Sequence, residues 1–183
     1  MRWTPAGPRR AVAAAAAAVL AVAGVACTPT FDWRTVRPEG TAIESLWPCR
    51  PAAERRAVRL AGADRPMALH ACAAGGVRFA LAVVAAGDPA QVAEVAAELR
   101  RATASNLGTT AVPVARPWAV RGATANAASG RVTLVGRAAD GRPLVAELGL
   151  FVTGTTVLQA VAVGDTLPPD VVDTFVASFA VAP

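Results

Sequence analysis

The sequence contains no lysine and no tyrosine, and His70 is its single histidine. All 18 basic residues are therefore arginine, against 13 acidic residues in the whole chain. Three of these arginines lie within the first ten residues, which leaves fifteen arginines against thirteen acidic residues in the remainder. Nucleic-acid binding needs a concentrated basic surface. This weak and scattered charge therefore argues against a nucleic-acid or other polyanionic partner.

The scarcity of histidine also limits the chemistry that the chain can perform. A hydrolase needs a nucleophile with a base in reach, and no serine here lies in a Gly-x-Ser-x-Gly elbow. Glu94 and Glu98 form a carboxylate pair, but their spacing predicts that both lie on the solvent face of a helix. We therefore expect no catalytic site and no cofactor.

The N-terminal segment has the layout of a secretion signal. Arg2, Arg9 and Arg10 are followed by residues 11–26, sixteen residues without a charge. A basic region before an apolar region is typical of a signal peptide. The apolar region is too short and too rich in alanine for a permanent transmembrane helix. We therefore expect residues 1–26 to be a signal peptide.

The signal ends at a cysteine. Residues 23–27 read Ala-Gly-Val-Ala-Cys, which resembles the lipobox of bacterial lipoproteins, in which the cysteine receives diacylglycerol on its sulfur and becomes the first residue. Cleavage after Ala23 is the alternative, and it would release a soluble protein with a free Cys27. The odd number of cysteines favours lipidation, because it leaves an even pair. If the cell has two membranes, Thr28 after the cysteine resembles the residue found at that place in lipoproteins that are sorted to the outer membrane.

The remaining pair, Cys49 and Cys72, would meet an oxidising compartment, where paired cysteines form disulfides. A bond between them would stabilise the fold by about 3 kcal/mol on the chain-entropy model. The alternative is a metal or redox site made of Cys49, His70 and Cys72, since His70 and Cys72 share one face of a predicted strand. That site lacks a fourth ligand and a Cys-x-x-Cys spacing. We therefore predict the disulfide and no metal.

The hydrophobic pattern predicts one α+β domain over residues 33–183, preceded by a tether over 27–32. Helices are expected from Asp88, with Gln91 completing a capping box, and from Pro168. The strand over 155–163 is apolar on both faces, so both must be covered. We expect an antiparallel sheet of about six to eight strands covered by helices on its faces. The predicted strands are 43–47, 54–60, 66–73, 77–84, 112–120, 131–137, 144–152, 155–163 and 180–181.

Several features occur in the order found in a known family. Trp33 is followed by Trp-Pro-Cys-Arg-Pro at 47–51, a strand pair, the helix from Pro89, a β-meander and the segment 175–179 of a last helix. This order resembles bacterial lipoproteins with the PsbP-like α/β/α sandwich. The resemblance implies a binding, scaffolding or assembly role beside a membrane, and it transfers no site residue.

These observations favour a membrane-anchored, non-catalytic interaction or assembly module of the cell envelope. Its expected partners are the membrane, through lipid on Cys27, and a protein that docks on the irregular segment 109–128. One alternative is a carrier of a small apolar ligand or lipid, which would use a cavity between sheet and helix. An enzyme using Cys49, His70 and Cys72 is the third and least expected class.

The lipoprotein prediction can be tested in cells. Globomycin, which blocks lipoprotein signal cleavage, should make an unprocessed precursor of the wild-type chain accumulate. The Cys27→Ala variant has no thiol to lipidate and should accumulate as an unmodified precursor without the drug. Normal cleavage of the signal in both cases would rule out the lipid anchor.

Overall fold

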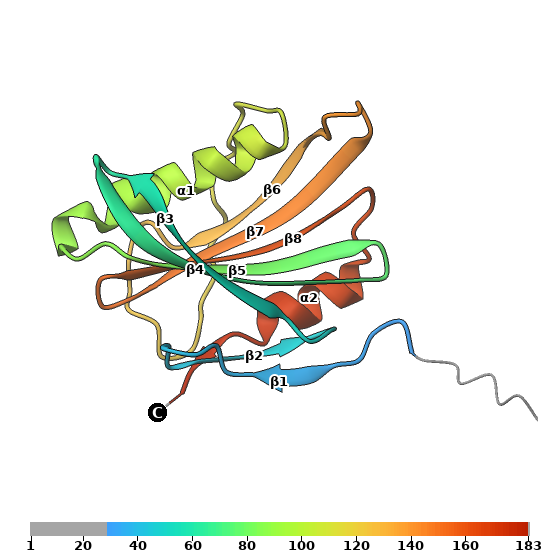
Figure 1. Ribbon diagram of the computed structural model, residues 1–183, viewed down its shortest axis with the longest axis horizontal. Coiled ribbons are helices and arrows are strands. Elements are labelled where there is room, and N and C mark those ends of the chain that lie inside the picture. The colour runs from blue at the N-terminus through green and yellow to red at the C-terminus, as the bar shows by residue number, and fades with distance from the viewer. Residues whose placement is uncertain (1–28, 183) are drawn as a thin grey trace, which may run out of the picture.

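The computed structural model describes residues 29–182, so the predicted signal peptide, Cys27 and Thr28 lie outside the described residues (Figure 1). The described chain forms a six-stranded sheet, a three-stranded sheet and two α-helices. Every pairing of strands is antiparallel, which confirms the predicted α+β class and its main sheet. The large sheet has the order β3 (Ala52–Leu60), β4 (Ala63–Ala74), β5 (Val77–Ala85), β8 (Thr156–Gly164), β7 (Pro143–Thr153) and β6 (Gly130–Arg137).

The small sheet has the order β1 (Arg34–Val36), β2 (Ile43–Trp47) and β9 (Ala180–Val181). It joins the start of the domain to its end, because β2 pairs with both neighbours. The sequence predicts β2 and β9 as strands but does not show that they leave the main sheet. The helices are α1 (Val92–Asn106), preceded by a short 3-10 turn at Pro89–Gln91, and α2 (Pro169–Ala177).

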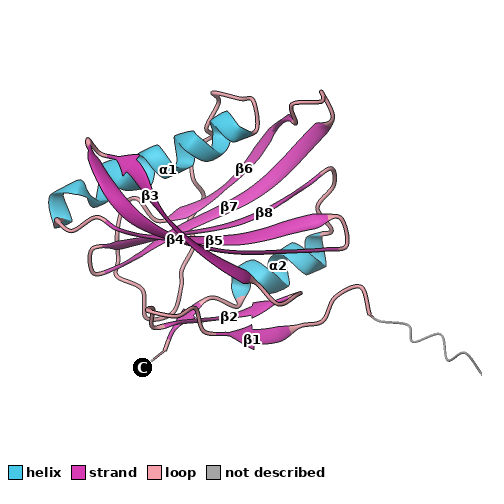
Figure 2. Ribbon diagram, in the orientation of Figure 1, coloured by secondary structure: helices cyan, strands magenta, loops and turns pink. Residues whose placement is uncertain are grey.

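The two faces of the large sheet bury separate apolar clusters, as the pattern of β8 predicts. Val157 of β8 belongs to the cluster under α1, whereas its neighbour Leu158 belongs to the cluster under α2. Figure 2 shows the two helices on opposite sides of the sheet. The side chains of a strand alternate between faces, so a strand that is apolar throughout needs cover on both.

The helical segment that covers the α1 side begins at Asp88. The Oδ1 atom of Asp88 accepts a hydrogen bond of 2.8 Å from the backbone N–H of Ala90. The predicted apolar stripe is buried, with Val95 fully inaccessible. The predicted capping box does not form, because the Gln91 side chain accepts from the guanidinium of Arg65 instead. Arg65 is buried and also donates to the backbone carbonyl of Leu60, at 3.0 Å. Its side chain therefore ties the β3–β4 hairpin to the start of the helical segment.

The α2 side is covered by the helix together with the small sheet. Phe175 of α2 lies with its ring centroid 5.2 Å from that of Trp47 and 5.1 Å from that of Phe79. All three side chains are fully buried. Edge-to-face aromatic packing of this kind adds about 1 kcal/mol per pair to the burial of the rings. The small sheet is thus part of the core and not an appendage.

The irregular segment 109–128 does not form the strand that the sequence predicts at 112–120, so that prediction is wrong. This segment makes only isolated bridges, from Arg116 to Arg131 and from Thr124 to Val152 among others. Two prolines within 112–120 remove backbone donors, so a continuous ladder cannot form. The segment is held instead by Trp118, which is half-buried and packs edge-on against the ring of Phe151, with ring centroids 5.3 Å apart. A Cβ placed on Gly149 would overlap the Trp118 ring, so only glycine fits beneath it.

A buried carboxylate provides the second anchor for this segment. Glu147 of β7 is only 4% exposed and accepts hydrogen bonds from Arg116 (2.5 Å), Arg131 Nε (2.8 Å) and Thr133 Oγ1 (2.8 Å). Arg131 also reaches Asp173 of α2 at 3.3 Å. Glu147 therefore connects the irregular segment, the edge strand β6 and the sheet in one charged network.

Replacing Glu147 with glutamine should destabilise the fold strongly, because two arginines then lose their buried anionic partner. We expect a loss of about 3 kcal/mol in the free energy of unfolding. The exposed Glu94→Gln variant is the matched control, with an expected change below about 0.5 kcal/mol. Urea titration of both variants measures the difference. Equal midpoints would show that the network contributes nothing.

Candidate functional site

Cys49 and Cys72 form a disulfide in the structure, as the sequence predicts, with their Cα atoms 6.0 Å apart. Cys49 follows β2 of the small sheet, and Cys72 lies in β4 of the large sheet. The bond therefore links the two sheets near the start of the domain. The sulfurs of a disulfide are neither thiolate nucleophiles nor metal ligands, so the alternative Cys49, His70 and Cys72 site is not formed here.

His70 lies two residues before Cys72, and its side chain is buried at 6% exposure. Its Nε2 atom has no hydrogen-bond partner among the described residues. Burial lowers the pKa of His70 from the usual histidine value, the charge of Arg55 lowers it further, and that of Glu39 opposes the shift. Within residues 29–182, no group of three histidine, cysteine or acidic side chains is placed to hold a metal ion. The imidazole is therefore a neutral group of the interior.

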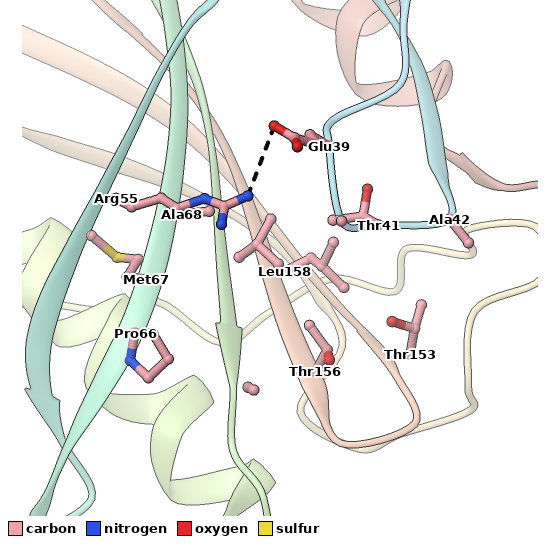
Figure 3. Close-up of a pocket in the computed structure, with 13 residues that line it drawn as sticks. Glu39, Thr41, Ala42, Arg55, Pro66, Met67, Ala68, Thr153, Thr156 and Leu158 are labelled. Atoms are coloured by element: carbon pink, nitrogen blue, oxygen red, sulfur yellow. Dashed lines mark ion pairs between the residues drawn. The ribbon is translucent and has the colours of Figure 1, made fainter.

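A pocket of about 400 Å³ opens where the loop before β2 faces the large sheet (Figure 3). Arg55 of β3 extends toward Glu39 of that loop, and the two charges lie 3.9 Å apart. Both side chains are mostly exposed, so the pair contributes at most about 1 kcal/mol. The lining is Glu39, Gly40, Thr41, Ala42, Arg55, Pro66, Met67, Ala68, Val83, Ala85, Thr153, Thr156 and Leu158. This set holds one ion pair and no nucleophile with a base.

A second hollow, which we call the α1 cleft, has a volume of about 350 Å³ and lies between α1 and strands β3, β4, β5 and β8. Its lining is mainly apolar and comprises Arg56, Val58, Arg59, Leu60, Met67, Leu69, Ala80, Ala82, Leu99, Ala102, Thr103, Asn106, Gln159 and Val161. Glu98, predicted to face solvent, instead accepts a hydrogen bond of 2.7 Å from the backbone N–H of Ala61. This contact fixes the β3–β4 turn against the helix.

The third candidate is an exposed edge, which we call the β6 edge surface and define by Val114 and Val135. Their side chains are 97% and 67% exposed, the highest values among the large apolar residues that the structure describes. Val135 lies on β6, and Val114 precedes Arg116, whose backbone exchanges hydrogen bonds of 2.8 Å with Arg131 of β6. Both valines therefore belong to one edge of the large sheet.

The chain enters the domain soon after Cys27. Phe31 covers Gly75 in the turn between β4 and β5, where a Cβ would overlap its ring. The backbone N–H of Asp32 donates to the carbonyl of Pro48 at 2.9 Å. Neither of the helices in the described range 29–182 has the length and apolar character needed to cross a bilayer.

The buried His70 should make the fold sensitive to acid. Since its folded pKa is lowered, the unfolded chain binds a proton that the folded protein disfavours. The free energy of unfolding should therefore fall as the pH drops through the ordinary histidine pKa of about 6.5. Denaturant titrations on both sides of that pH should show a smaller fall for His70→Gln than for the wild type. A parallel fall in the two proteins would contradict this assignment.

Comparisons of the chain with protein-family models, with curated proteins and with solved structures gave no significant match.

Proposed function

We propose that the protein is an exported, membrane-anchored lipoprotein that acts as a non-catalytic interaction or assembly module of the cell envelope. Lipid on Cys27 would provide the attachment. An extended chain from Cys27 to Asp32 reaches at most about 18 Å, so the first fixed residue of the domain would stay close to the bilayer. The β4–β5 turn, which Phe31 covers, would then lie at the membrane end of the domain.

The observation that carries this proposal is the β6 edge surface. Exposed apolar surface favours a protein interface, and Val114 and Val135 are two exposed valines on the same edge of the large sheet. Val114 lies in the irregular segment, and that segment is fixed by the Glu147 network and by Trp118 on Gly149. A partner would therefore meet a rigid surface and would lose little conformational freedom on docking.

We also propose that the domain is a PsbP-like α/β/α sandwich. The large sheet with one helix on each face, together with the Trp-Pro-Cys-Arg-Pro segment at 47–51, supports a PsbP-like α/β/α sandwich. Domains of that kind bind or assist assembly beside membranes. A sorting signal at Thr28 would place the protein on the periplasmic side of the outer membrane in a cell with two membranes.

A photoreactive amino acid placed at position 114 or 135 in cells tests the interface. We expect both positions to give the same discrete adduct with one envelope protein. Position 94, on the exposed side of α1, is the matched control and should give none. Adding Val135→Arg to the chain that carries the photoreactive residue at position 114 should remove the adduct, because a charged side chain cannot be buried unpaired.

Either of two results would contradict the interface. An adduct of equal strength from position 94, or none from positions 114 and 135 in a protein that is correctly localised, would exclude the β6 edge surface as a docking site.

The second candidate, a carrier of a small apolar ligand or lipid, is favoured by the α1 cleft. The volume of the cleft, about 350 Å³, lies within the usual range for small-molecule sites. Its lining is mainly apolar, as in most such sites.

A further inference from the structure

The α1 cleft exists because the helix covers its face of the large sheet incompletely. Its floor is made by Ala80 and Ala82 of β5 with Val161 of β8, and the small alanine side chains leave it deep. Leu69 of β4 and Val58 of β3 also line it. Removing apolar surface of this kind from water favours the binding of an apolar ligand.

One buried polar side chain faces this apolar space. Gln159 of β8 is only 2% exposed, and its Nε2 donates to Thr103 Oγ1 at 2.7 Å. The Thr103 hydroxyl in turn donates to the carbonyl of Leu99 at 3.1 Å. This bond holds the Gln159 side chain against α1.

The charged side chains at the mouth of the cleft are all positive. Two arginines line it, Arg56 and Arg59, and the lining contains no acidic residue. Arg59 is already engaged, at 3.5 Å from Asp64 and 3.0 Å from the carbonyl of Gly62. Arg56 forms no ion pair with any described residue, and its guanidinium can therefore bind an anion. An apolar cleft with a cationic mouth is complementary to an amphiphile with an anionic head.

We propose that the α1 cleft binds a single-chain fatty acid. The acyl chain lies on Ala80, Ala82 and Val161, and the carboxylate pairs with Arg56 at the mouth. This inference develops the carrier alternative and is independent of both the lipid on Cys27 and a protein partner at the β6 edge surface.

The probe is a photoactivatable lauric acid added to isolated membranes that contain the full chain. After irradiation and digestion, labelled residues should map to β3, β5, β8 and the second half of α1. Unlabelled laurate should compete, whereas dodecanol, which lacks the carboxylate, should compete about threefold less well, the factor expected for one exposed ion pair. Competition by a lysophospholipid but not by laurate would reassign the head group and overturn the fatty-acid proposal.

Two variants that fill the cleft provide the structural test. Ala80→Leu raises the floor and Ala102→Leu narrows the mouth from the helix, and each should reduce labelling about tenfold. Ala97→Leu is the matched control, because Ala97 is exposed on α1 but does not line the cleft. Circular dichroism and the intact disulfide show whether a variant has folded. The Ala102 variant, at an exposed helical site, keeps the test valid if Ala80→Leu fails to fold.

A matched pair of arginines tests the mouth. Arg56→Ala should reduce labelling about threefold, whereas Arg55→Ala, a neighbour that lines the other pocket, should leave it unchanged. Labelling that is spread over the surface, or that survives Ala102→Leu at the wild-type level, would overturn the proposal. Because all these readouts are independent of position 114 or 135, loss of the partner adduct would leave this result unaffected.

Discussion

The structure depends on a central sheet whose middle strands are apolar on both faces. β8 directs Val157 to one side and Leu158 to the other, and each side chain is completely buried. Such a strand is stable only between two covering layers. On one face the cover is α1; on the other it is α2 together with a small sheet that the Cys49–Cys72 disulfide links to β4.

The two layers do not cover the sheet equally well, and the candidate sites follow from this inequality. Under α2, Phe175 packs against Trp47 and Phe79, and the aromatic rings fill the space between helix and sheet. Above the other face, α1 leaves the floor at Ala80 and Ala82 open as the α1 cleft. The β6 edge surface lies elsewhere, on the segment that Glu147 fixes. Two separate binding surfaces can therefore coexist on one domain.

Much of this fold was predictable from the sequence, because the apolar pattern of a strand and the number of cysteines can both be read without knowing which residues meet in space. The strand over 155–163 is apolar on both faces, which predicted cover on both. Export to an oxidising compartment, expected from the N-terminal segment, predicted the bond between Cys49 and Cys72. The candidate sites were harder to predict from the sequence. Glu147 sits in a strand that otherwise looks apolar, and its partners come from the irregular segment. Gln91 fits a capping box by spacing, yet the buried Arg65 competes for it through a contact between distant residues.

The layer formed by α1 is the incomplete one, because it leaves the α1 cleft open. Hydrogen–deuterium exchange of the full chain in phospholipid nanodiscs tests it directly, with and without laurate. Without ligand, the amides of β5 and β8 should exchange most slowly. Laurate should then slow exchange selectively in β3, whose outer edge is unpaired, and in the second half of α1. Unchanged exchange in those two elements, or equal slowing in α2 and the small sheet, would contradict the account.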